Sequence, residues 1–450
     1  MAVAIGCSLM FFDSASAQPS GSVETLAQAL AAAYADNPTL NAQRANLRAT
    51  DEGVPQALSG FRPQISADAS TGITNASGGG SSATFFPSGV SLTITQPLFT
   101  GGRTVNGVKI AETAVLAGRE VLRNTEQTTL LSAVSAFMNL VQAQALLNLQ
   151  KQNLDFLGQQ GKAATDRLNV GEGTRTDVAQ TNASLAAGQA SYDSAVAALN
   201  TAIAVYAQVI GHEPKALGAA KPVDNLLSKN LNAALADAMT YHPAILAASY
   251  NIDISDFNVK VAEGALLPTV ALQGQLSHQE GGLSGSNGNS ASAVASLSVP
   301  IFSGGDSSAK VRQAKEVLDQ ARIQLDAARD TVREETISAW GTLDAARAQI
   351  RAADSETTAQ NLVLSGIIEE QKVGQATTLD VLNAQQTLLS ARVAFVTAQH
   401  DRVVASYTLL AAIGKLNAET LGLDVASYDP VQHYVQVRDK WGGLRTPDGR

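Results

Sequence analysis

The sequence predicts an all-α dominated protein with a membrane β-barrel contribution, built as two copies of a helix–β-hairpin–long-helix unit. Three observations predict this fold class. Alanine is abundant, while aromatic residues make up only 5% and charged residues 16% of the 450 residues, a composition typical of close-packed long helices. Punctuating proline and glycine residues recur 203 to 205 positions apart. In each half, two segments of about ten residues alternate apolar and polar side chains, as membrane-barrel strands do.

Charge and motif content exclude several classes of function. The formal net charge is −9, so nucleic acid is not an expected partner, because a phosphate-binding surface must be basic. The five histidines are scattered and show no metal-ligand spacing. No phosphate-binding loop of the Gly-x-x-x-x-Gly-Lys-Ser/Thr type occurs, and no acid–base or nucleophile set converges. We therefore expect no enzyme, no metal site and no cofactor.

The N-terminus has the pattern of a secretory signal. Residues 2–12 are nearly all apolar, and small residues follow at 14–17, the pattern after which signal peptidase cleaves. We expect residues 1–17 to be removed, although no Lys or Arg precedes the apolar run, which leaves a start farther upstream open. A lipoprotein carrying its lipid on Cys7 is the alternative. No later stretch has the roughly 18 consecutive apolar residues of a transmembrane helix, so the chain is expected to cross a membrane only within a closed β-barrel.

The first repeat starts with short helices. Asn37 is the expected N-cap of a helix whose first residue is Pro38, and Pro63 ends that helical region. A hairpin, a proline-free helix roughly 100 Å long and a return helix ended by Gly211 follow. The expected elements of this repeat, residues 18–211, are strands at about 65–74 and 90–97, a long helix at about 104–170 and a return helix at 176–211.

The second repeat presents the same signals in the same order after a linker at 212–230. The motif Pro-[Leu/Ile]-Phe-[Thr/Ser]-Gly-Gly closes both hairpins, at 97–102 and at 300–305. A heptad of aliphatic and small residues from Val311 to Val332 marks the face that the second long helix buries. The expected elements of residues 231–414 are strands at about 269–277 and 293–300, a long helix at about 307–373 and a return helix at 379–414, followed by a C-terminal segment at 415–450 with a disordered tail.

Two short polar turns end the long helices. The first contains Val170 and Gly171, and the second contains Val373, Gly374 and Thr377. Glycine in such a turn is sufficiently explained by its permissive backbone. A polar turn at the end of so long a helical hairpin is nevertheless placed to contact something distant, so we expect the two tips to be functional.

One chain contributes too few strands for a membrane barrel with a lumen. Four predicted strands are available, whereas the smallest such barrels have about eight. We therefore expect several chains to pool their strands, with two chains giving eight and three giving twelve. The alanine-rich faces of the long helices also indicate that several chains assemble, because these faces need helical neighbours.

Together these features resemble the TolC family of outer-membrane efflux proteins over essentially the whole mature chain. The resemblance is carried by the duplicated unit, Asn37-Pro38, the two Pro-[Leu/Ile]-Phe-x-Gly-Gly turns, the two Val-Gly…Asp tips and the Leu-Ala-Ala-Ile-Gly run at 410–414. It implies a homotrimer with a twelve-stranded β-barrel in outer-membrane lipid and a periplasmic α-helical barrel, surrounded by an equatorial belt that includes the C-terminal segment.

The resemblance also implies a function. Members of the family are not enzymes but passive exit ducts for drug efflux or type I protein secretion. They dock through their helical tips to a periplasmic adaptor protein and an inner-membrane transporter, which implies this role for Val170, Gly171, Val373, Gly374 and Thr377.

Family resemblance assigns a gate role to the residues that follow the tips. Two carboxylates ring the closed periplasmic mouth in the family. Here Asp380 keeps the first position, but Asn383 stands at the second, which halves the expected ring charge. From the sequence alone, Asp380 is equally well explained as a helix-capping residue.

A latch across the tips is the second implied device. The family's arginine and tyrosine of the second tip are replaced here by Ala376 and Gln371. Arg175, beside Asp177 and Gln180 in the first tip, is therefore the expected basic partner.

Two alternatives stay open. Within the family, secretion of one protein substrate competes with multidrug efflux. From another class, a non-transporting trimeric helical envelope scaffold or adhesin is disfavoured by the hairpins, because a scaffold has no use for strands with one lipid-compatible face.

Overall fold

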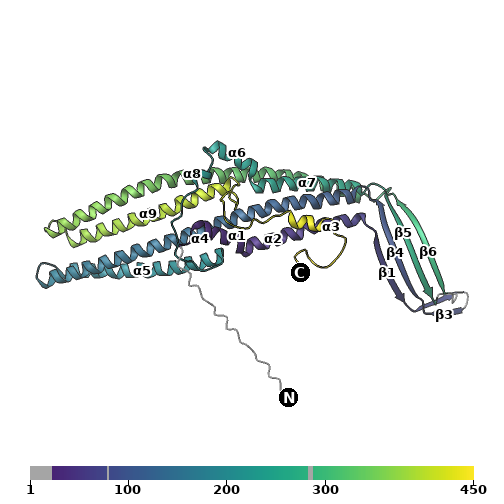
Figure 1. Cartoon of the computed structure of the whole chain (residues 1–450), viewed down its shortest axis with the longest axis horizontal. Coiled ribbons are helices and arrows are strands. Elements are labelled where there is room, and N and C mark those ends of the chain that lie inside the picture. The colour runs from purple at the N-terminus through teal and green to yellow at the C-terminus, as the bar shows by residue number, and fades with distance from the viewer. Residues whose placement is uncertain (1–22, 79–80, 282–286) are drawn as a thin grey trace, which may run out of the picture.

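The computed structural model describes residues 23–78, 81–281 and 287–450. The predicted signal peptide, residues 1–17, and Cys7 lie outside the described residues. The molecule is elongated, with a helical part that ends in two tips and a small sheet at the opposite end (Figure 1). The predicted mostly helical class with a short-stranded sheet is therefore confirmed for the single chain.

Two very long helices form the frame of the molecule. α4 and α8 have 67 residues each, and each packs antiparallel against the return helix that follows it. Their ends lie within one or two residues of the predicted ones, because glycine turns punctuate the sequence there. The long elements are α4 (Arg103–Asn169), α5 (Arg175–Ile210), α8 (Asp306–Lys372) and α9 (Thr378–Ala412).

Short helices continue the line of the return helices along α4 and α8. At the first joint, the Asn37 side-chain Nδ2 donates to the Val209 carbonyl at 2.9 Å, while its Oδ1 accepts from the Thr39 amide as the N-cap. At the second joint, Gly414 packs directly against His242. The short helices are α1 (Leu26–Asp36), α2 (Pro38–Asp51), α3 (Gly53–Leu58), η1 (Ser59–Phe61), η2 (Asp224–Leu226), α6 (Leu231–Tyr241), α7 (Pro243–Gly264) and α10 (Gln432–Val437).

The main sheet has four antiparallel strands in the order β1-β4-β5-β6. Its register places Ala67 opposite Leu92, and Leu92 opposite Leu276, so aliphatic side chains of several strands share one face. Ser, Thr and Gln residues occupy most of the other face. The strands are β1 (Gln64–Thr71), β4 (Ser88–Phe99), β5 (Thr269–Glu280) and β6 (Gly288–Ser298).

Part of the Gly/Ser-rich segment between the two predicted strands of the first repeat is a second hairpin, so the prediction of only two strands in this repeat was wrong. β2 (Thr74–Gly78) pairs with β3 (Ser81–Phe85). Ser, Gly and Asn have low strand propensity, so composition masked a pairing that depends on backbone hydrogen bonds. For the same reason β5 and β6 extend beyond their predicted ends into the Gly/Ser/Asn-rich connection.

The hydrophobic core lies near the middle of the long helices. Its largest fully buried side chains include Tyr206, Phe137 and Leu410, and Trp340 packs against it. In this region α1 packs against α4 and α5, and α6 packs against α8. Small and aliphatic residues at heptad-like spacing are buried on both long helices, namely Ala133, Ala136, Leu140, Ala143 and Leu157 on α4 and Leu318, Ala321, Leu325 and Val332 on α8.

Among the described residues, α4 and α5 are long and apolar enough to cross a membrane by length and composition, with mean hydropathies of 1.5 and 1.3 in their best windows. The expectation of no transmembrane helix used a different criterion, an unbroken apolar run, and it stays a prediction. The two helices pack along each other, and alanine-rich faces that serve helix packing give the same composition.

The C-terminal segment returns toward the sheet along the first repeat. α10 packs on α2, where His433 Nδ1 lies 2.9 Å from Asp51 Oδ2. Burial raises the pKa of the Asp51 carboxyl, and the neighbouring His433 acts in the opposite direction. Residues 442–450 form no helix or strand.

Gly414→Ala should destabilise the protein more than Gly211→Ala. Both glycines end a return helix in the left-handed region, with φ of +78° and +100°, which costs an alanine about 1–2 kcal/mol. At Gly414 a Cβ would also lie 2.7 Å from the His242 Cα, whereas at Gly211 the nearest atom is 3.5 Å away. Thermal unfolding followed by circular dichroism compares the variants, and equal losses of melting temperature would contradict the packing of the second joint.

Candidate functional site at the helical tips

Both tips are built on the same local geometry. Gly171 and Gly374 adopt φ of +82° and +79°, so they end the long helices in the conformation that glycine favours. Val170 and Val373 precede them, and each side chain is 72% exposed. Each tip therefore presents one exposed aliphatic side chain at the end of the molecule farthest from the sheet (Figure 1).

The aspartate after each tip closes a capping box. In the second tip, the Thr377 hydroxyl accepts from the Asp380 amide at 3.2 Å, and Asp380 Oδ2 accepts from the Thr377 amide at 2.8 Å and from its hydroxyl at 2.6 Å. Thr174 and Asp177 repeat the arrangement in the first tip. The capping interpretation of Asp380 is therefore correct, because the carboxylate completes the first helical turn.

The capping hydrogen bonds keep both carboxyl groups charged. Donation from Thr377 lowers the pKa of Asp380, and donation from Thr174 lowers the pKa of Asp177. Because the pKa is lowered, the charged cap contributes its full stabilisation at any pH above the ordinary aspartate pKa of 3.8. This stabilisation is lost as the pH falls through the lowered pKa. Both tips are thus anionic throughout the neutral range.

The polar residues one turn after the aspartates carry no charge. Asn383 follows Asp380 on the exposed side of α9, and Gln180 follows Asp177 on α5. Residues three apart on a helix are neighbours, so each pair combines one carboxylate with one amide.

The cation that lies between the tips is Arg167, a residue that the sequence reasoning missed. Its Nη2 lies 3.5 Å from Gln371 Oε1 on α8, and Gln371 Nε2 lies 3.3 Å from the Thr378 hydroxyl. Arg175 is exposed at the start of α5, and its role in a latch stays a prediction. The position of Arg167 in the last turn of α4 was the only sequence signal for this contact. It was not specific, because a basic residue at a helix C-terminus usually complements the helix dipole.

A second missed feature joins the two halves of the chain between the core and the tips. Asn153 on α4 accepts from Gln385 on α9 at 3.0 Å, and both side chains are buried. Nearer the core, Gln142 donates to Thr397 at 3.1 Å. Buried amides must be paired, so these hydrogen bonds set the register between the halves. Polar residues at otherwise apolar helix positions were the signal that could have revealed them.

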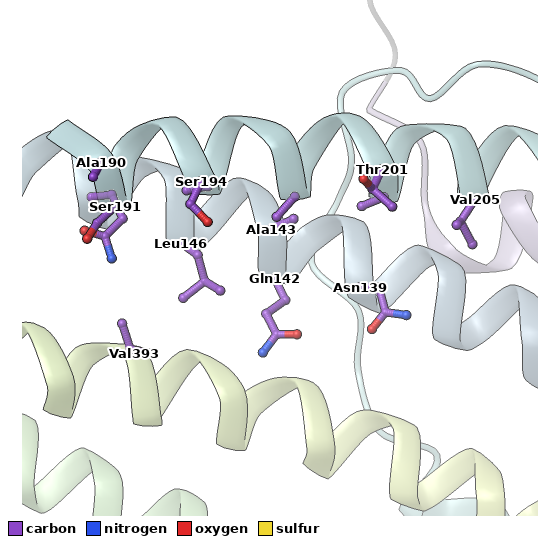
Figure 2. Close-up of a pocket in the computed structure, with 14 residues that line it drawn as sticks. Asn139, Gln142, Ala143, Leu146, Ala190, Ser191, Ser194, Thr201, Val205 and Val393 are labelled. Atoms are coloured by element: carbon purple, nitrogen blue, oxygen red, sulfur yellow. The ribbon is translucent and has the colours of Figure 1, made fainter. Parts of the chain in front are cut away.

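A groove of about 890 Å³ lies above this junction, between α4, α5 and α9. Figure 2 shows Gln142 and Leu146 of α4 pointing toward α9, from which Val393 points back toward α4. Its lining residues are small or uncharged, so the groove holds no acid–base pair. In the part of the chain that the structure describes, no group of three or more His, Cys, Asp or Glu side chains is placed to hold a metal ion.

The sequence matches the family model for outer membrane efflux proteins twice, over residues 29–212 and 234–415, once in each repeat. It is 47% identical over 431 residues to the outer membrane efflux protein BepC of Brucella suis biovar 1 (strain 1330), covering 95% of this chain and 93% of that protein. It is 26% identical over 439 residues to the outer membrane protein TolC of Escherichia coli (strain K12), covering 93% and 87% of the two chains.

A solved structure shows the same fold. The Campylobacter jejuni CmeC outer membrane channel superposes with a TM-score of 0.78 at 18% identity, covering 92% of this chain and 89% of that one. The resemblance that the motifs predicted is therefore confirmed. The chain belongs to the outer membrane efflux protein family, the family of TolC, and is a non-enzymatic efflux or secretion channel of the outer membrane.

Proposed function

We propose that three copies of this chain form one channel-tunnel, a twelve-stranded outer-membrane β-barrel continued by a periplasmic α-helical barrel. The observation that carries the proposal is the sheet, whose edge strands β1 and β6 have no outer neighbour among the described residues. An unpaired strand edge is not tolerated in lipid, so such a sheet must be completed by other copies. Two copies supply eight strands, whose interior is filled by side chains, whereas three leave a lumen.

The channel serves as the passive exit duct of a tripartite drug efflux pump. A periplasmic adaptor protein and an energised inner-membrane transporter are the partners, and the helical tips open by an iris-like movement. A relative with 47% identity is described by its name as an efflux protein, which favours efflux over type I protein secretion, the second candidate.

The internal duplication predicts how one copy meets the next. Within the chain, the first half joins the second through β4 with β5, α4 with α7, and α4 with α9. The equivalent contacts of the second half would join β6 to β1, and α8 to α2 and α5, of the following copy. Repeating one head-to-tail contact in this way generates a ring when the rotation closes.

Burial differences between the halves support this arrangement. Gln385 on α9 is buried against α4, and Leu382 and Leu389 on the same helix are also buried. Their counterparts 203 positions earlier, Ala179, Asn182 and Ala186, are exposed on α5. The exposed stripe on α5 therefore corresponds to the stripe on α9 that is covered by α4 within the chain. In the proposed ring, α8 of another copy would cover the stripe on α5.

The same difference is found on the long helices. Val134 of α4 is fully buried, whereas its counterpart on α8, Ile337, is 46% exposed. Asn153 is buried in α4, whereas its counterpart Glu356 is exposed on α8. The exposed face of α8 thus corresponds to the face of α4 that packs against the second half of the chain.

Cysteines at Asn182 and Glu356 should form disulfides between copies under mild oxidation. These positions are the counterparts of Gln385 and Asn153, whose side chains are 3.0 Å apart. Non-reducing gels should show covalent dimers and trimers of the double variant, and monomers of each single variant. Cysteines at Asn153 and Gln385 are the matched control, because they should link within one chain. If the control pair oxidises and the test pair does not, the proposed contact between copies is wrong.

Asp380 is proposed as the anionic ring of the periplasmic mouth, with Asn383 as a neutral second position. The lowered pKa of Asp380 supports a charged ring at neutral pH. Since Asp380 also caps α9, its replacement must preserve the cap. Asparagine does so, because its side-chain oxygen still accepts hydrogen bonds.

Asp380→Asn should weaken divalent-cation block of single channels in planar bilayers by about tenfold, because the ring loses its charge. Asn383→Asp should strengthen the block, because it adds a second ring. In the unmodified channel the block should persist as the pH is lowered to 3.8, the ordinary pKa of an aspartate. It should be lost only as the pH falls further, through the lowered pKa of Asp380. Asp177→Asn alters the equivalent capping box in the other tip, so a loss of block that is larger in Asp380→Asn than in Asp177→Asn assigns the effect to the ring and not to the cap. Unchanged block in Asp380→Asn would remove this residue from the gate.

The adaptor is proposed to dock at the tips, on Val170-Gly171 and Val373-Gly374 with Thr377. Support comes from the two valine side chains, each 72% exposed at the far end of the helices. An exposed aliphatic side chain flanked by polar groups is a common element of protein interfaces.

Val170→Asp together with Val373→Asp should abolish efflux without loss of the channel from the outer membrane, because a charge at each contact would be desolvated on docking. The measurement is the sensitivity of a complemented deletion strain to dyes and bile salts, together with its secreted proteins. Val23→Asp, at a position 53% exposed before α1, is the control. Full resistance in the double variant would exclude docking through these residues.

A further inference from the structure

The C-terminal segment is attached to the first repeat at successive points that approach the sheet. His433 meets Asp51 near the end of α2. Farther along, Arg438 Nη2 lies 3.1 Å from Glu112 Oε1 on α4. The Lys440 carbonyl then accepts from Arg62 Nη1 at 2.8 Å. Residues 433–440 are therefore held along the helices that lead into β1.

These contacts position Trp441 at the base of the sheet. The Arg62 guanidinium lies 4.6 Å from the centroid of the Trp441 ring, and β1 starts at Gln64. Trp441 remains 75% exposed, and Leu444 beyond it is fully exposed. Lys440 Nζ donates to the Arg445 carbonyl at 2.7 Å, which brings together the two ends of the short segment that contains the tryptophan and the leucine.

Large apolar side chains are exposed around the same level of the molecule, where strands give way to helices. They lie just before the strands that leave the helical part, and at or just after the ends of the strands that return to it. The exposed set is Phe61, Leu98, Phe99, Leu266, Leu267, Val299, Ile301 and Phe302. A belt of this kind at the end of a sheet with one apolar face is typical of the boundary between lipid and water.

The charge of the C-terminal segment differs in sign from that of the whole chain. The chain has a net charge of −9, whereas residues 432–450 are net positive. Their charged residues are Arg438, Lys440, Arg445 and Arg450 against Asp439 and Asp448. Clustered cations next to exposed apolar residues match the phosphates and acyl chains of a phospholipid surface.

We propose that residues 440–445 anchor the protein to the periplasmic leaflet of the outer membrane. The proposal rests on the proposed function, which places the sheet in the membrane. Trp441 and Leu444 lie at the boundary of the acyl chains, and Lys440 and Arg445 bind lipid phosphates. The Lys440 ammonium has three donors, of which one is used within the segment. Arg62 positions Trp441 by holding one face of its ring.

Phospholipid fits this patch better than a second copy of the chain. The segment combines an exposed tryptophan, an exposed leucine and an excess of cations, and it continues the apolar belt at the base of the sheet. The neighbouring copy would bring Ile301 and Phe302 toward this edge of the sheet, and neither offers a group that pairs with a cation. A second copy covering Trp441 is therefore an outcome that would overturn the proposal.

The chain contains two tryptophans, which gives a direct test. Trp340→Phe leaves Trp441 as the only tryptophan, and Trp441→Phe leaves Trp340, which packs against the helical core. Each variant is reconstituted into vesicles of phosphatidylethanolamine and phosphatidylglycerol, with and without brominated acyl chains. Trp441 should lose roughly half of its emission to bromine placed near the headgroups, because an interfacial tryptophan lies within reach of it. Trp340 should lose none.

Two further measurements complete the test. Lys440→Gln with Arg445→Gln should reduce the quenching of Trp441, since the phosphate contacts are removed. If Trp441 is quenched by aqueous iodide and not by brominated lipid, it is exposed to water and the anchor is wrong. If neither agent quenches it, a second copy of the chain covers it and the anchor is also wrong. Single-channel conductance of the same vesicles separates this outcome from failure of the proposed function, because a channel that conducts while Trp441 stays unquenched refutes the anchor alone.

Discussion

Backbone hydrogen bonding at the sheet edges is the constraint on which the rest of the structure depends. β1 and β6 each lack an outer neighbour in the described chain, and hydrocarbon supplies no water to satisfy their amides and carbonyls. The sheet can therefore function in a membrane only when copies of the chain complete it. Because each repeat attaches one hairpin to one long helix, closure of the strands also brings the helices of successive copies into a ring.

In the proposed channel, the helical part extends the ring by more than 60 residues per long helix. Its register is held by a compact core at mid-length and by buried amide pairs such as Asn153 with Gln385. At the far end the two tips close with equivalent capping boxes. Capping does not compete with the gate role proposed for Asp380, because one carboxylate oxygen completes the helix cap while the charge remains available to an ion.

Much of this architecture could be predicted from the sequence because its signals are local. Proline, glycine and heptad spacing located the long helices to within one or two residues, and the motifs predicted the family. Features that depend on distant contacts were not predictable. Asn153 and Gln385 are 232 positions apart, and His433 and Asp51 are 382 apart, so no local pattern links them. Arg167 was missed because an arginine near a helix C-terminus has an ordinary local explanation.

Native mass spectrometry of the protein extracted from outer membranes in mild detergent tests the central claim most directly. Completion of both sheet edges by head-to-tail contact predicts a single species with three times the mass of the mature chain, and no stable folded monomer. A folded, monodisperse monomer or dimer that still conducts ions after reconstitution would contradict the account.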